Sequence, residues 1–304
     1  MVTDKITIAM PVYERIDFFE EALNSALKQT ISCPVYVIDN ASSHNKFREI
    51  AEKHNNPLVT YIRNEKNIGM IGNWNRCIEA CRTEYLSILH DDDVLHPNFI
   101  ECCLKFLKEP PSQQCCFSVS TIVGKDHLVL FRQKERKERY KIFKKKYFLF
   151  GNLASFPGIL FPVSVAKRIG SFSESKYPIS DFDFWIRLSE YVPIYKSNLP
   201  YAFYRYSDQQ CTHEAFLEMI EKAYLLRKSL FPNPSCVSYF FSMYSLYNTY
   251  IFYCEAYKKK INIALDINIS DMSKLFNFFY KTNIGLFKYI YKYSYKIFRK
   301  LITL

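Results

Sequence analysis

Apolar runs of strand length alternate with segments of helical spacing through the first 123 residues of the chain. The predicted strands cover residues 5–11, 34–39, 58–62, 85–89 and 115–123. The predicted helices between them cover residues 18–27, 47–54, 70–81 and 97–107. Strands that alternate with helices in this way are typical of βαβ units, so we expect an α/β fold with a mostly parallel sheet flanked by helices.

The pattern changes after about residue 210. Helical spacing dominates residues 216–231 and 237–257. Residues 285–304 place apolar and aromatic side chains on one helical stripe, with Lys and Arg mostly off it. Such a helix either lies at a membrane interface or packs on the protein as an ordinary amphipathic helix. We therefore expect an α/β domain over residues 1–210 and a helical, basic and aromatic region over residues 211–304.

Charge is distributed unevenly along the 304 residues, whose formal net charge is +11. Residues 132–146 hold nine Lys or Arg and two Glu, and residues 257–304 hold ten Lys or Arg and two Asp. The rest of the chain is therefore mildly acidic. Two basic patches on an acidic body indicate a polyanionic partner, either a membrane surface or nucleic acid. The first patch is also explained as a solvated loop or helix face.

The N-terminal segment and the cysteines indicate a cytoplasmic protein. A strand-like run begins at residue 5 without a signal peptide, and no stretch reaches the roughly 20 apolar residues of a membrane-spanning helix. The ten cysteines form no C-x-x-C pair. We expect buried, reduced thiols rather than a disulfide framework or a zinc site.

The most informative segment, residues 85–97, reads Y-L-S-I-L-H-D-D-D-V-L-H-P. Its apolar strand ends in a histidine and three consecutive acids, which are His90, Asp91, Asp92 and Asp93. Adjacent carboxylates repel one another, and a bound cation or a donor-rich ligand relieves that repulsion. The alternative is a solvated acidic turn that caps the next helix. Because Asp39 also ends a strand, we expect it to face the same crevice as the acidic cluster.

Several short motifs occur in an order that resembles the family 2 glycosyltransferases. They are P-V-Y at 11–13, V-I-D-N-A-S at 37–42, N-I-G at 67–69, G-N-W-N at 72–75, I-L-H-D-D-D at 88–93 and S-D-F-D-F-W-I-R-L at 180–188. The resemblance covers about residues 5–206. It implies a GT-A fold (Rossmann-like), with a nucleotide-sugar half over residues 1–123 and an acceptor half over residues 124–210. It also implies an inverting, nucleotide-sugar-dependent enzyme.

The resemblance implies a divalent cation, Mn²⁺ or Mg²⁺, that stabilises the negative charge of the leaving diphosphate. Both ions prefer hard oxygen ligands and often keep only one or two protein carboxylates. The family pattern D-x-D-D falls on residues 90–93, with His90 in place of the first acid. It implies that Asp92 contacts the metal, that Asp93 supports it, and that Asp91 lies toward the ribose or the metal. For His90, packing is the alternative to a role at the site.

The resemblance also places a set of residues around the donor nucleotide. They are Pro11, Tyr13, Glu14, Arg15, Asp39, Asn67, Gly69 and Asp91. We expect Asp39 to accept a hydrogen bond from the base or the ribose, although a solvated turn acid is the alternative. Arg15 could reach the diphosphate. The segment 204–207 resembles the family's Y-R-x-H, but Ser207 stands where a histidine often joins the metal.

Asp181 is the predicted general base. In the family pattern E-D-x-x-x-W the second acid is the base and aligns with Asp181, while Ser180 replaces the glutamate. A base must lie within hydrogen-bonding reach of the acceptor hydroxyl. Asp183, two residues further on, would point elsewhere on a helix. Helix N-capping is the alternative role for Asp181.

These features predict a metal-assisted glycosyltransferase, of hexosyl or N-acetylhexosaminyl type, on the inner face of the cytoplasmic membrane. A nucleotide diphosphate sugar, in the first place a UDP-sugar, is the expected donor. The expected acceptor is a glycan or a lipid-linked molecule in surface polysaccharide, lipopolysaccharide or capsule synthesis. Peripheral contact with anionic membrane is expected through residues 285–304, and no nucleic-acid partner is expected.

Three alternatives remain open at this point. A homologue could bind nucleotide sugars without turnover. A nucleotidyltransferase would show a glycine-rich phosphate loop after the first strand, and residues 10–17 hold no glycine. A module that binds nucleic acid or membrane through the basic segments would leave the three adjacent acids unexplained.

Overall fold

The computed structural model describes residues 1–108, 114–124, 137–152, 154, 156–205, 211–256, 272, 274 and 278–279. The chain divides into two compact units. The first comprises Met1–Phe148 and Asn152–Gln210, and the second comprises Leu149–Gly151 and Cys211–Leu304. The α/β sheet and all the predicted site residues belong to the first unit.

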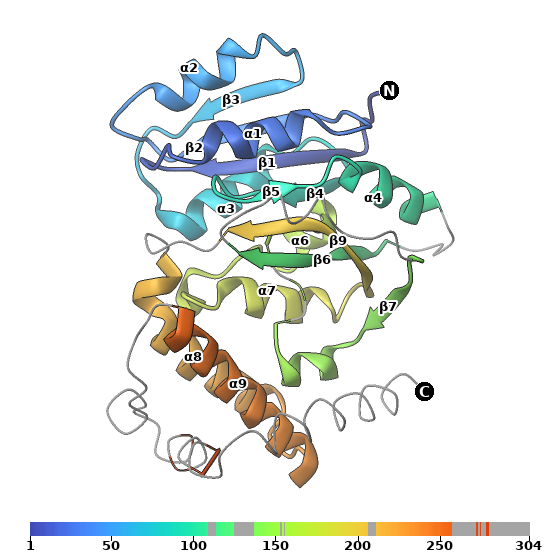
Figure 1. Ribbon diagram of the computed structural model, residues 1–304, viewed down its shortest axis with the longest axis vertical. Helices are drawn as coiled ribbons and strands as arrows, with labels where there is room; N and C mark the ends of the chain where they lie inside the picture. Colours follow the sequence, from blue (N-terminus) through green and yellow to red (C-terminus); the bar gives the residue numbers. More distant parts are fainter. Residues whose placement is uncertain are drawn as a thin grey trace. The chain divides into compact units, whose positions relative to one another are not determined.

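Four parallel strands form one half of the sheet, in the order β3-β2-β1-β4 (Figure 1). These strands are β1 (Ile6–Val12), β2 (Val35–Asp39), β3 (Val59–Arg63) and β4 (Tyr85–Ile88). The helices are α1 (Phe19–Leu27), α2 (Lys46–Lys53), α3 (Gly69–Ala80) and α4 (Phe99–Lys108). All eight elements begin and end within two residues of the predicted bounds, so this part of the fold prediction is confirmed.

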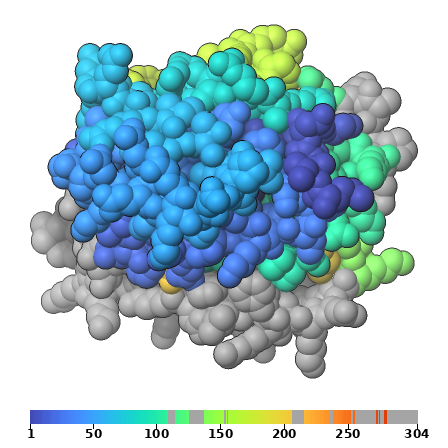
Figure 2. All heavy atoms as spheres, turned by 90° about the horizontal axis from the view of Figure 1, so that it is seen from above, coloured from blue at the N-terminus to red at the C-terminus, as the bar shows by residue number. Residues whose placement is uncertain are grey.

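The position of each strand in the sheet explains its pattern of burial. All seven residues of β1 are buried because β1 is central and covered on both faces, which gives a continuous apolar run. β3 is the last strand on its side, and its residues are half-buried or exposed. The light-blue segments of α2 and β3 cover much of the face that Figure 2 shows.

The other half of the sheet mixes strand directions. β8 (Ile159–Pro162) runs antiparallel to β4 and to β6 (Cys116–Gly124), and β9 (Ile194–Arg205) runs parallel to β6. β5 (Val94–Leu95) and β7 (Tyr140–Phe143) pair with β9 in antiparallel register. The sequence predicted β6 but not β5, β7, β8 or β9. β5 and β8 are too short to carry a recognisable period of two.

Four short helical elements lie along the chain around β8. They are the 3₁₀ helix η1 (Lys145–Phe150), α6 (Val163–Arg168), the 3₁₀ helix η2 (Glu174–Lys176) and α7 (Ser180–Leu188). α7 carries the predicted base and lies within residues 124–210, which the sequence predicted as the acceptor half. Five of its nine residues are hydrophobic, and all five are buried, as are Ser180 and Asp183, so packing fixes the position of the helix.

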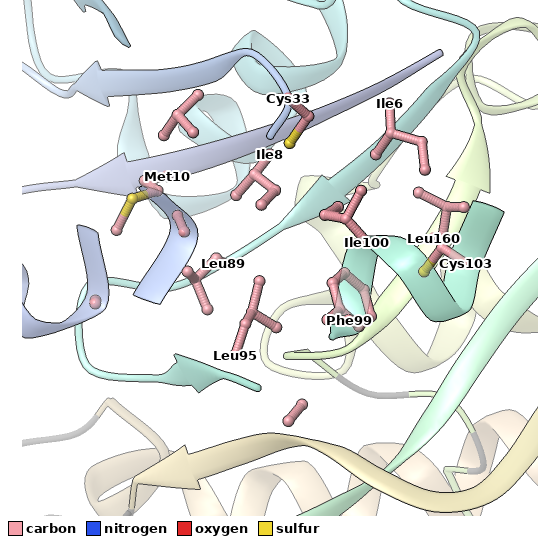
Figure 3. Close-up of a cluster of buried hydrophobic side chains, with 14 of the residues drawn as sticks. Ile6, Ile8, Met10, Cys33, Leu89, Leu95, Phe99, Ile100, Cys103 and Leu160 are labelled. Atoms are coloured by element: carbon pink, nitrogen blue, oxygen red, sulfur yellow. The ribbon is translucent and has the colours of Figure 1, made fainter. Parts of the chain in front are cut away.

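A buried apolar cluster fixes the position of β1 (Figure 3). Ile6, Ile8 and Met10 alternate along the strand and belong to one cluster with Phe99 and Ile100 of α4. All five side chains are fully buried. Burial of such a side chain contributes about 1.5–3 kcal/mol, and a slip by one residue would turn these positions to the other face. The cluster therefore sets the register in which the strand ends meet.

The cysteines with described side chains are buried, as expected. They are Cys33, Cys77, Cys81, Cys102, Cys103, Cys115, Cys116 and Cys254. Burial raises the pKa of Cys33 to about 12, so this thiol is inert at neutral pH.

The second unit contains two long helices, α8 (Cys211–Leu230) and α9 (Cys236–Ala256). The buried Arg227 of α8 donates a hydrogen bond to the carbonyl oxygen of Ser242 in α9 at 3.1 Å. The predicted helical segments 216–231 and 237–257 correspond to these two helices. None of the helices in the described ranges is long and apolar enough to cross a membrane. The predicted interfacial helix over residues 285–304 lies outside those ranges.

Gly158, just before β8, should be intolerant of any side chain. A Cβ at this position would lie 2.5 Å from Val119 Cγ2 and 2.7 Å from Ala202 Cβ, and the backbone φ is +88°. Gly170 has a similar φ of +84° with nothing within 4 Å, so it serves as a control for backbone strain alone. We expect Gly170→Ala to cost about 1–2 kcal/mol of unfolding free energy and Gly158→Ala about 1–3 kcal/mol more. Urea denaturation would measure both, and equal losses would contradict the clash.

Candidate active site

The carboxyl ends of β1, β2 and β4 meet at one edge of the sheet. In the parallel ladders Val12 pairs with Asp39, and the N–H of Leu89 donates to the carbonyl oxygen of Ala9 at 2.9 Å. The segments that follow these strands are therefore neighbours in space, although they are far apart in sequence. This register places Asp39 and the acidic cluster at the same edge of the sheet, as expected from the sequence.

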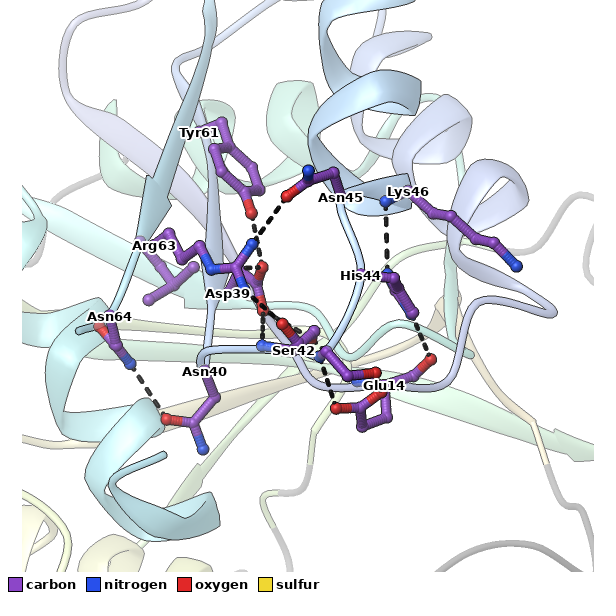
Figure 4. Close-up of polar contacts among 12 residues, drawn as sticks. Glu14, Asp39, Asn40, Ser42, His44, Asn45, Lys46, Tyr61, Arg63 and Asn64 are labelled. Carbon is purple, nitrogen blue, oxygen red and sulfur yellow. Dashed lines mark hydrogen bonds and ion pairs between the residues drawn. The ribbon is translucent and has the colours of Figure 1, made fainter. Parts of the chain in front are cut away.

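Asp39 is fully buried, and both of its carboxylate oxygens are engaged within the chain (Figure 4). Oδ1 accepts hydrogen bonds from the backbone N–H and the hydroxyl of Ser42, at 3.0 and 2.6 Å. Oδ2 accepts one from the Tyr61 hydroxyl at 2.5 Å and lies 3.9 Å from Arg63 Nε. Burial, with the bond to Asp39, raises the pKa of Tyr61 to about 12. Because Oδ1 already accepts two hydrogen bonds, a base or ribose that bonds to Asp39 would use the remaining acceptor site of Oδ2 or displace one of these partners.

Glu14 joins the loop after β1 to the loop after β2. Its carboxylate accepts hydrogen bonds from the backbone N–H and hydroxyl of Ser43, at 2.7 and 2.8 Å, and these bonds lower its pKa. The backbone N–H of Glu14 donates to Ser42 Oγ at 3.0 Å, and its φ is +55°. Tyr13 beside it is 44% exposed, whereas Pro11 is buried within β1.

An asparagine network surrounds the predicted donor residues Asn67 and Gly69. Asn67 Oδ1 accepts hydrogen bonds from Asn40 Nδ2 and from the N–H of Gly69, both at 2.8 Å. Asn40 Oδ1 accepts one from Asn64 Nδ2 at 3.1 Å. Asn40 and Asn64 were not among the predicted site residues. Each of them directly follows a strand: Asn40 follows β2, and Asn64 follows β3. This position was the signal in the sequence that could have identified them.

Arg15 lies between the first two acids of the cluster. Its Nη2 atom is 2.9 Å from Asp91 Oδ1 and 2.6 Å from Asp92 Oδ2. Burial works against the charge of Arg15, but the two carboxylates raise its pKa above the usual range. Burial raises the pKa of Asp91 to about 6, against the opposing effect of Arg15. A single cationic nitrogen therefore satisfies two carboxylate oxygens that converge on it.

Asp93 has a different environment. Its side chain is fully buried, and Oδ1 accepts the backbone N–H of Arg205 at 2.9 Å. Arg205 Nε also donates to the carbonyl oxygen of Asp92 at 2.8 Å. Because β9 runs antiparallel to β5, the end of β9 meets the start of β5, where the acidic cluster ends. Asp93 Oδ2 has no hydrogen-bond partner among the described residues, and burial raises the pKa of Asp93 well above its ordinary value.

His90 packs in an aromatic cluster, with 23% of its side chain exposed. Its ring centroid lies 5.5 Å from that of Trp74, in a stacked arrangement, and 4.9 Å from that of Phe156. Burial lowers the pKa of His90 to about 4, so the ring is neutral. Phe156 in turn lies 5.4 Å from Trp185 of α7. This chain of rings connects the acidic cluster to the helix that carries Asp181, and it favours the packing role for His90.

The two acids at the start of α7 have different partners. Asp183 is buried and pairs with Arg187 Nε at 2.8 Å, and Arg187 also donates to the carbonyl oxygens of Ile169 and Ser171. Asp181 pairs with no Lys or Arg in the described part of the chain. Its Oδ2 accepts a hydrogen bond from Asn152 Nδ2 at 2.8 Å, and burial raises its pKa to about 6. Asp183 is thus held in an ion pair within its own helix, whereas the carboxylate of Asp181 is more basic than that of an ordinary aspartate.

The donor set of the acidic cluster fits a divalent cation. Among the described residues, no group of three or more His, Cys, Asp or Glu side chains is arranged to hold a metal. Mg²⁺ and related ions often use only one or two protein carboxylates beside substrate phosphates and water. Asp91 Oδ1 and Asp92 Oδ2 already converge on one positive nitrogen, which satisfies that smaller requirement. The predicted contact of Asp93 with a metal stays a prediction, because its Oδ1 is held by Arg205.

A model of glycosyl transferase family 2 matches residues 7–168, more than half of the chain. The chain belongs to glycosyl transferase family 2. It is therefore a transferase with a GT-A-type α/β fold, and both predictions are confirmed. The match ends before Asp181, so the assignment of the base depends on the motif at residues 180–188 and on the geometry described above.

The curated relatives of this family 2 glycosyltransferase are distant. An uncharacterised glycosyltransferase of Methanocaldococcus jannaschii is 25% identical over 187 residues, which cover 60% of this chain and 63% of the relative. A chondroitin synthase of Escherichia coli is 25% identical over 190 residues, which cover 62% of this chain and 27% of the synthase. The matches thus span less than two thirds of the length of both relatives.

Solved structures share the fold at low sequence identity. Residues 1–349 of Staphylococcus aureus TarS in complex with UDP align with a TM-score of 0.60 and 16% identity, over 85% of this chain and 75% of that one. A mannosyltransferase of Pyrobaculum calidifontis in complex with GDP-Man and Mn²⁺ aligns with a TM-score of 0.54 and 15% identity, over 85% of this chain and 76% of that one.

The different environments of Asp181 and Asp183 predict opposite effects of two matched substitutions. Asp183→Asn weakens the contact with Arg187 and should cost about 1–3 kcal/mol of unfolding free energy. The pKa of Asp181 is about 6 in the folded protein, above the ordinary 3.8. Because the folded state disfavours the ionised carboxylate, the wild-type protein loses stability as the pH rises from 3.8 to about 6. Asp181→Asn removes that loss and should stabilise the protein by on the order of 1–2 kcal/mol at pH 7.5, and by less at pH 5.

Urea denaturation of the three proteins at both pH values would test this expectation. An Asp181→Asn variant that is destabilised to the same extent as Asp183→Asn would contradict it, because both acids would then have structural roles.

Proposed function

We propose that this glycosyltransferase moves a sugar from a nucleotide diphosphate sugar to a hydroxyl group of a glycan or lipid-linked acceptor, with inversion at the sugar. The observation that carries the proposal is the pairing of two unlike acidic sites through one aromatic cluster. At one site two carboxylate oxygens converge on a single cation. At the other, Asp181 has no Lys or Arg partner among the described residues and a pKa of about 6.

Asp91 and Asp92 would hold the metal of the donor site, with Asp93 behind them. The metal, when bound, supplies Lewis-acid stabilisation of the charge on the leaving diphosphate. Arg15 is charged and lies at the same place, so its guanidinium would contact the diphosphate. Arg205 would keep the acidic cluster in position, because it bonds both to the backbone of Asp92 and to the carboxylate of Asp93.

Asp181 would accept the proton of the attacking hydroxyl. A general base works best when its pKa lies near the operating pH, and a carboxylate with a pKa of about 6 is both ionised and more basic than an ordinary one at neutral pH. Asn152, through its bond to Oδ2, would orient the carboxylate. One base and one direct displacement give inversion, in parallel with the inverting glycoside hydrolases.

The identity of the donor is supported by the fold relatives. TarS has structures with UDP and with UDP-GlcNAc, and the Pyrobaculum mannosyltransferase has one with GDP-Man and Mn²⁺. A UDP-linked hexose or N-acetylhexosamine is our first candidate. The Escherichia coli chondroitin synthase among the relatives supports a glycan acceptor, as in surface polysaccharide, lipopolysaccharide or capsule synthesis. Peripheral attachment to the cytoplasmic membrane through residues 285–304 stays a prediction.

A thermal-shift screen would test the donor site without knowledge of the acceptor. UDP, GDP, dTDP and CDP, each with and without Mn²⁺, would be compared for their effect on the unfolding temperature. We expect one nucleotide to stabilise the protein by about 2–4 kcal/mol at 100–1,000 times its dissociation constant, and only when Mn²⁺ is present. If no nucleotide gave a metal-dependent shift, the proposed function would be wrong.

Asp181→Asn and Asp92→Asn should impair transfer in different ways. Loss of the base should lower kcat by about 10²–10⁴-fold while the nucleotide still binds. Loss of Asp92 should abolish the Mn²⁺-dependent part of nucleotide binding as well. In the wild-type protein kcat/KM should rise with pH through an apparent pKa near 6, as Asp181 ionises. Released nucleotide, measured against pH, reports turnover and its pH dependence, and the thermal-shift assay reports nucleotide binding. Retention of full activity by Asp181→Asn would rule out its role as base.

A further inference from the structure

The contact between Arg15 and the acidic pair occupies the position that a donor-site cation requires. One atom, Arg15 Nη2, contacts both Asp91 Oδ1 and Asp92 Oδ2 within hydrogen-bond distance. The side chains of Asp91 and Asp92 are only 13% and 5% exposed, and that of Arg15 is 24% exposed. A divalent cation and a guanidinium repel each other strongly at such short separation in a partly buried site. Both cannot use these two oxygens at once.

The main chain around the contact is fixed, so the guanidinium is the part that can move. The N–H of Arg15 bonds to the carbonyl oxygen of Tyr13 at 2.6 Å, and Glu14 is held by Ser43. On the other side, Arg205 holds the backbone of Asp92. Rotation of the long Arg15 side chain would release the two oxygens without movement of either strand end.

The other acids close to this edge of the sheet already have partners. Asp39 is bonded to Ser42 and Tyr61, Glu14 to Ser43, and Asp93 Oδ1 to the N–H of Arg205. A guanidinium displaced by a metal would therefore lose its charge-assisted bonds. Among these acids Asp93 Oδ2 is the one carboxylate oxygen without a hydrogen-bond partner in the described part of the chain, and it is fully buried. A diphosphate in the same site supplies the missing anion, and Arg forms two-pronged bonds to phosphate readily.

We propose that Arg15 is the counter-cation of Asp91 and Asp92 when the donor site is empty, and that its transfer from these acids to the donor diphosphate couples metal binding to nucleotide binding. This inference rests on the proposed function. A metal that binds alone has to break the ion pairs of Arg15 with Asp91 and Asp92, and Arg15 then has no new partner. When a nucleoside diphosphate binds with the metal, the diphosphate becomes the new ionic partner of Arg15. Coupling between two ligands is reciprocal, so Mn²⁺ and UDP should each strengthen the binding of the other by the same factor.

Arg15→Gln tests this coupling by removing the competing charge. In the wild-type protein Mn²⁺ alone should bind weakly, and saturating UDP should tighten it by about 10–100-fold. In Arg15→Gln, Mn²⁺ alone should bind about tenfold more tightly or better, and the enhancement by UDP should be smaller than in the wild-type protein, because only the direct attraction between metal and diphosphate remains. Titration of free Mn²⁺ by electron paramagnetic resonance measures both quantities without any transfer reaction. If UDP is not the nucleotide that the protein binds, the diphosphate identified by the thermal-shift screen replaces it.

Arg76→Gln is the matched control. Arg76 pairs with Glu79 at 3.3 Å on an exposed part of α3. The same substitution at this position also removes one positive charge, but not one that contacts Asp91 or Asp92. It should leave Mn²⁺ affinity and the enhancement by UDP unchanged. Arg15→Lys keeps the charge but not the planar guanidinium, and it should give intermediate values for both. Arg15→Lys also provides the test if Arg15→Gln fails to fold.

The outcomes separate the two levels of the proposal. A wild-type protein that binds neither Mn²⁺ nor any nucleoside diphosphate overturns the proposed function and this inference with it. A wild-type protein that binds both, with the same enhancement factor in wild type and in the Arg15 variants, overturns this inference alone. Tighter binding of Mn²⁺ alone by the Arg15 variant, together with a smaller enhancement, supports both.

Discussion

The site depends on the register of β1, which pairs on one side with β2 and on the other with β4. Ile8 is opposite Val35 in one ladder and opposite Ser87 in the other. The carboxyl end of β1 therefore lies between Asp39, at the end of β2, and the acidic cluster after β4. Burial of Ile6, Ile8 and Met10 holds that register, because a slip by one residue would turn all three side chains to the opposite face of the sheet. The apolar core thus decides which polar groups can meet.

Aromatic packing fixes the acidic cluster relative to α7 in a similar way. His90, Phe156 and Trp185 form a continuous set of ring contacts. Closely packed interiors transmit displacement with little compliance, so the acids at either end are held at a fixed separation. The cost of this arrangement is visible at the acids themselves, since burial raises the pKa values of Asp91, Asp93 and Asp181. The free energy of folding that the apolar core contributes offsets the cost of burying these carboxylates.

The parts of the fold and site that the sequence predicted are those with local signals. β1 to β4 and their helices have long apolar runs or clear helical spacing, and their bounds were predicted to within two residues. The preference for Asp181 over Asp183 came from a motif of nine residues, and the Asp183–Arg187 pair is itself local. What could not be predicted depends on contacts between distant positions. Arg205 lies 112 residues from Asp93, and its role follows only from the antiparallel pairing of β5 with β9.

For Arg15, the sequence and the structure indicate different partners. Its sequence position after β1 indicated a contact with the donor diphosphate, and the structure shows its guanidinium on two carboxylates instead. The two placements are compatible if they belong to different states of one site. A guanidinium is attracted to whichever anion is closest and least neutralised, which is the acidic pair before a metal binds and the diphosphate afterwards. The same cation can therefore protect the empty site from its own charge repulsion and then contribute to holding the leaving group.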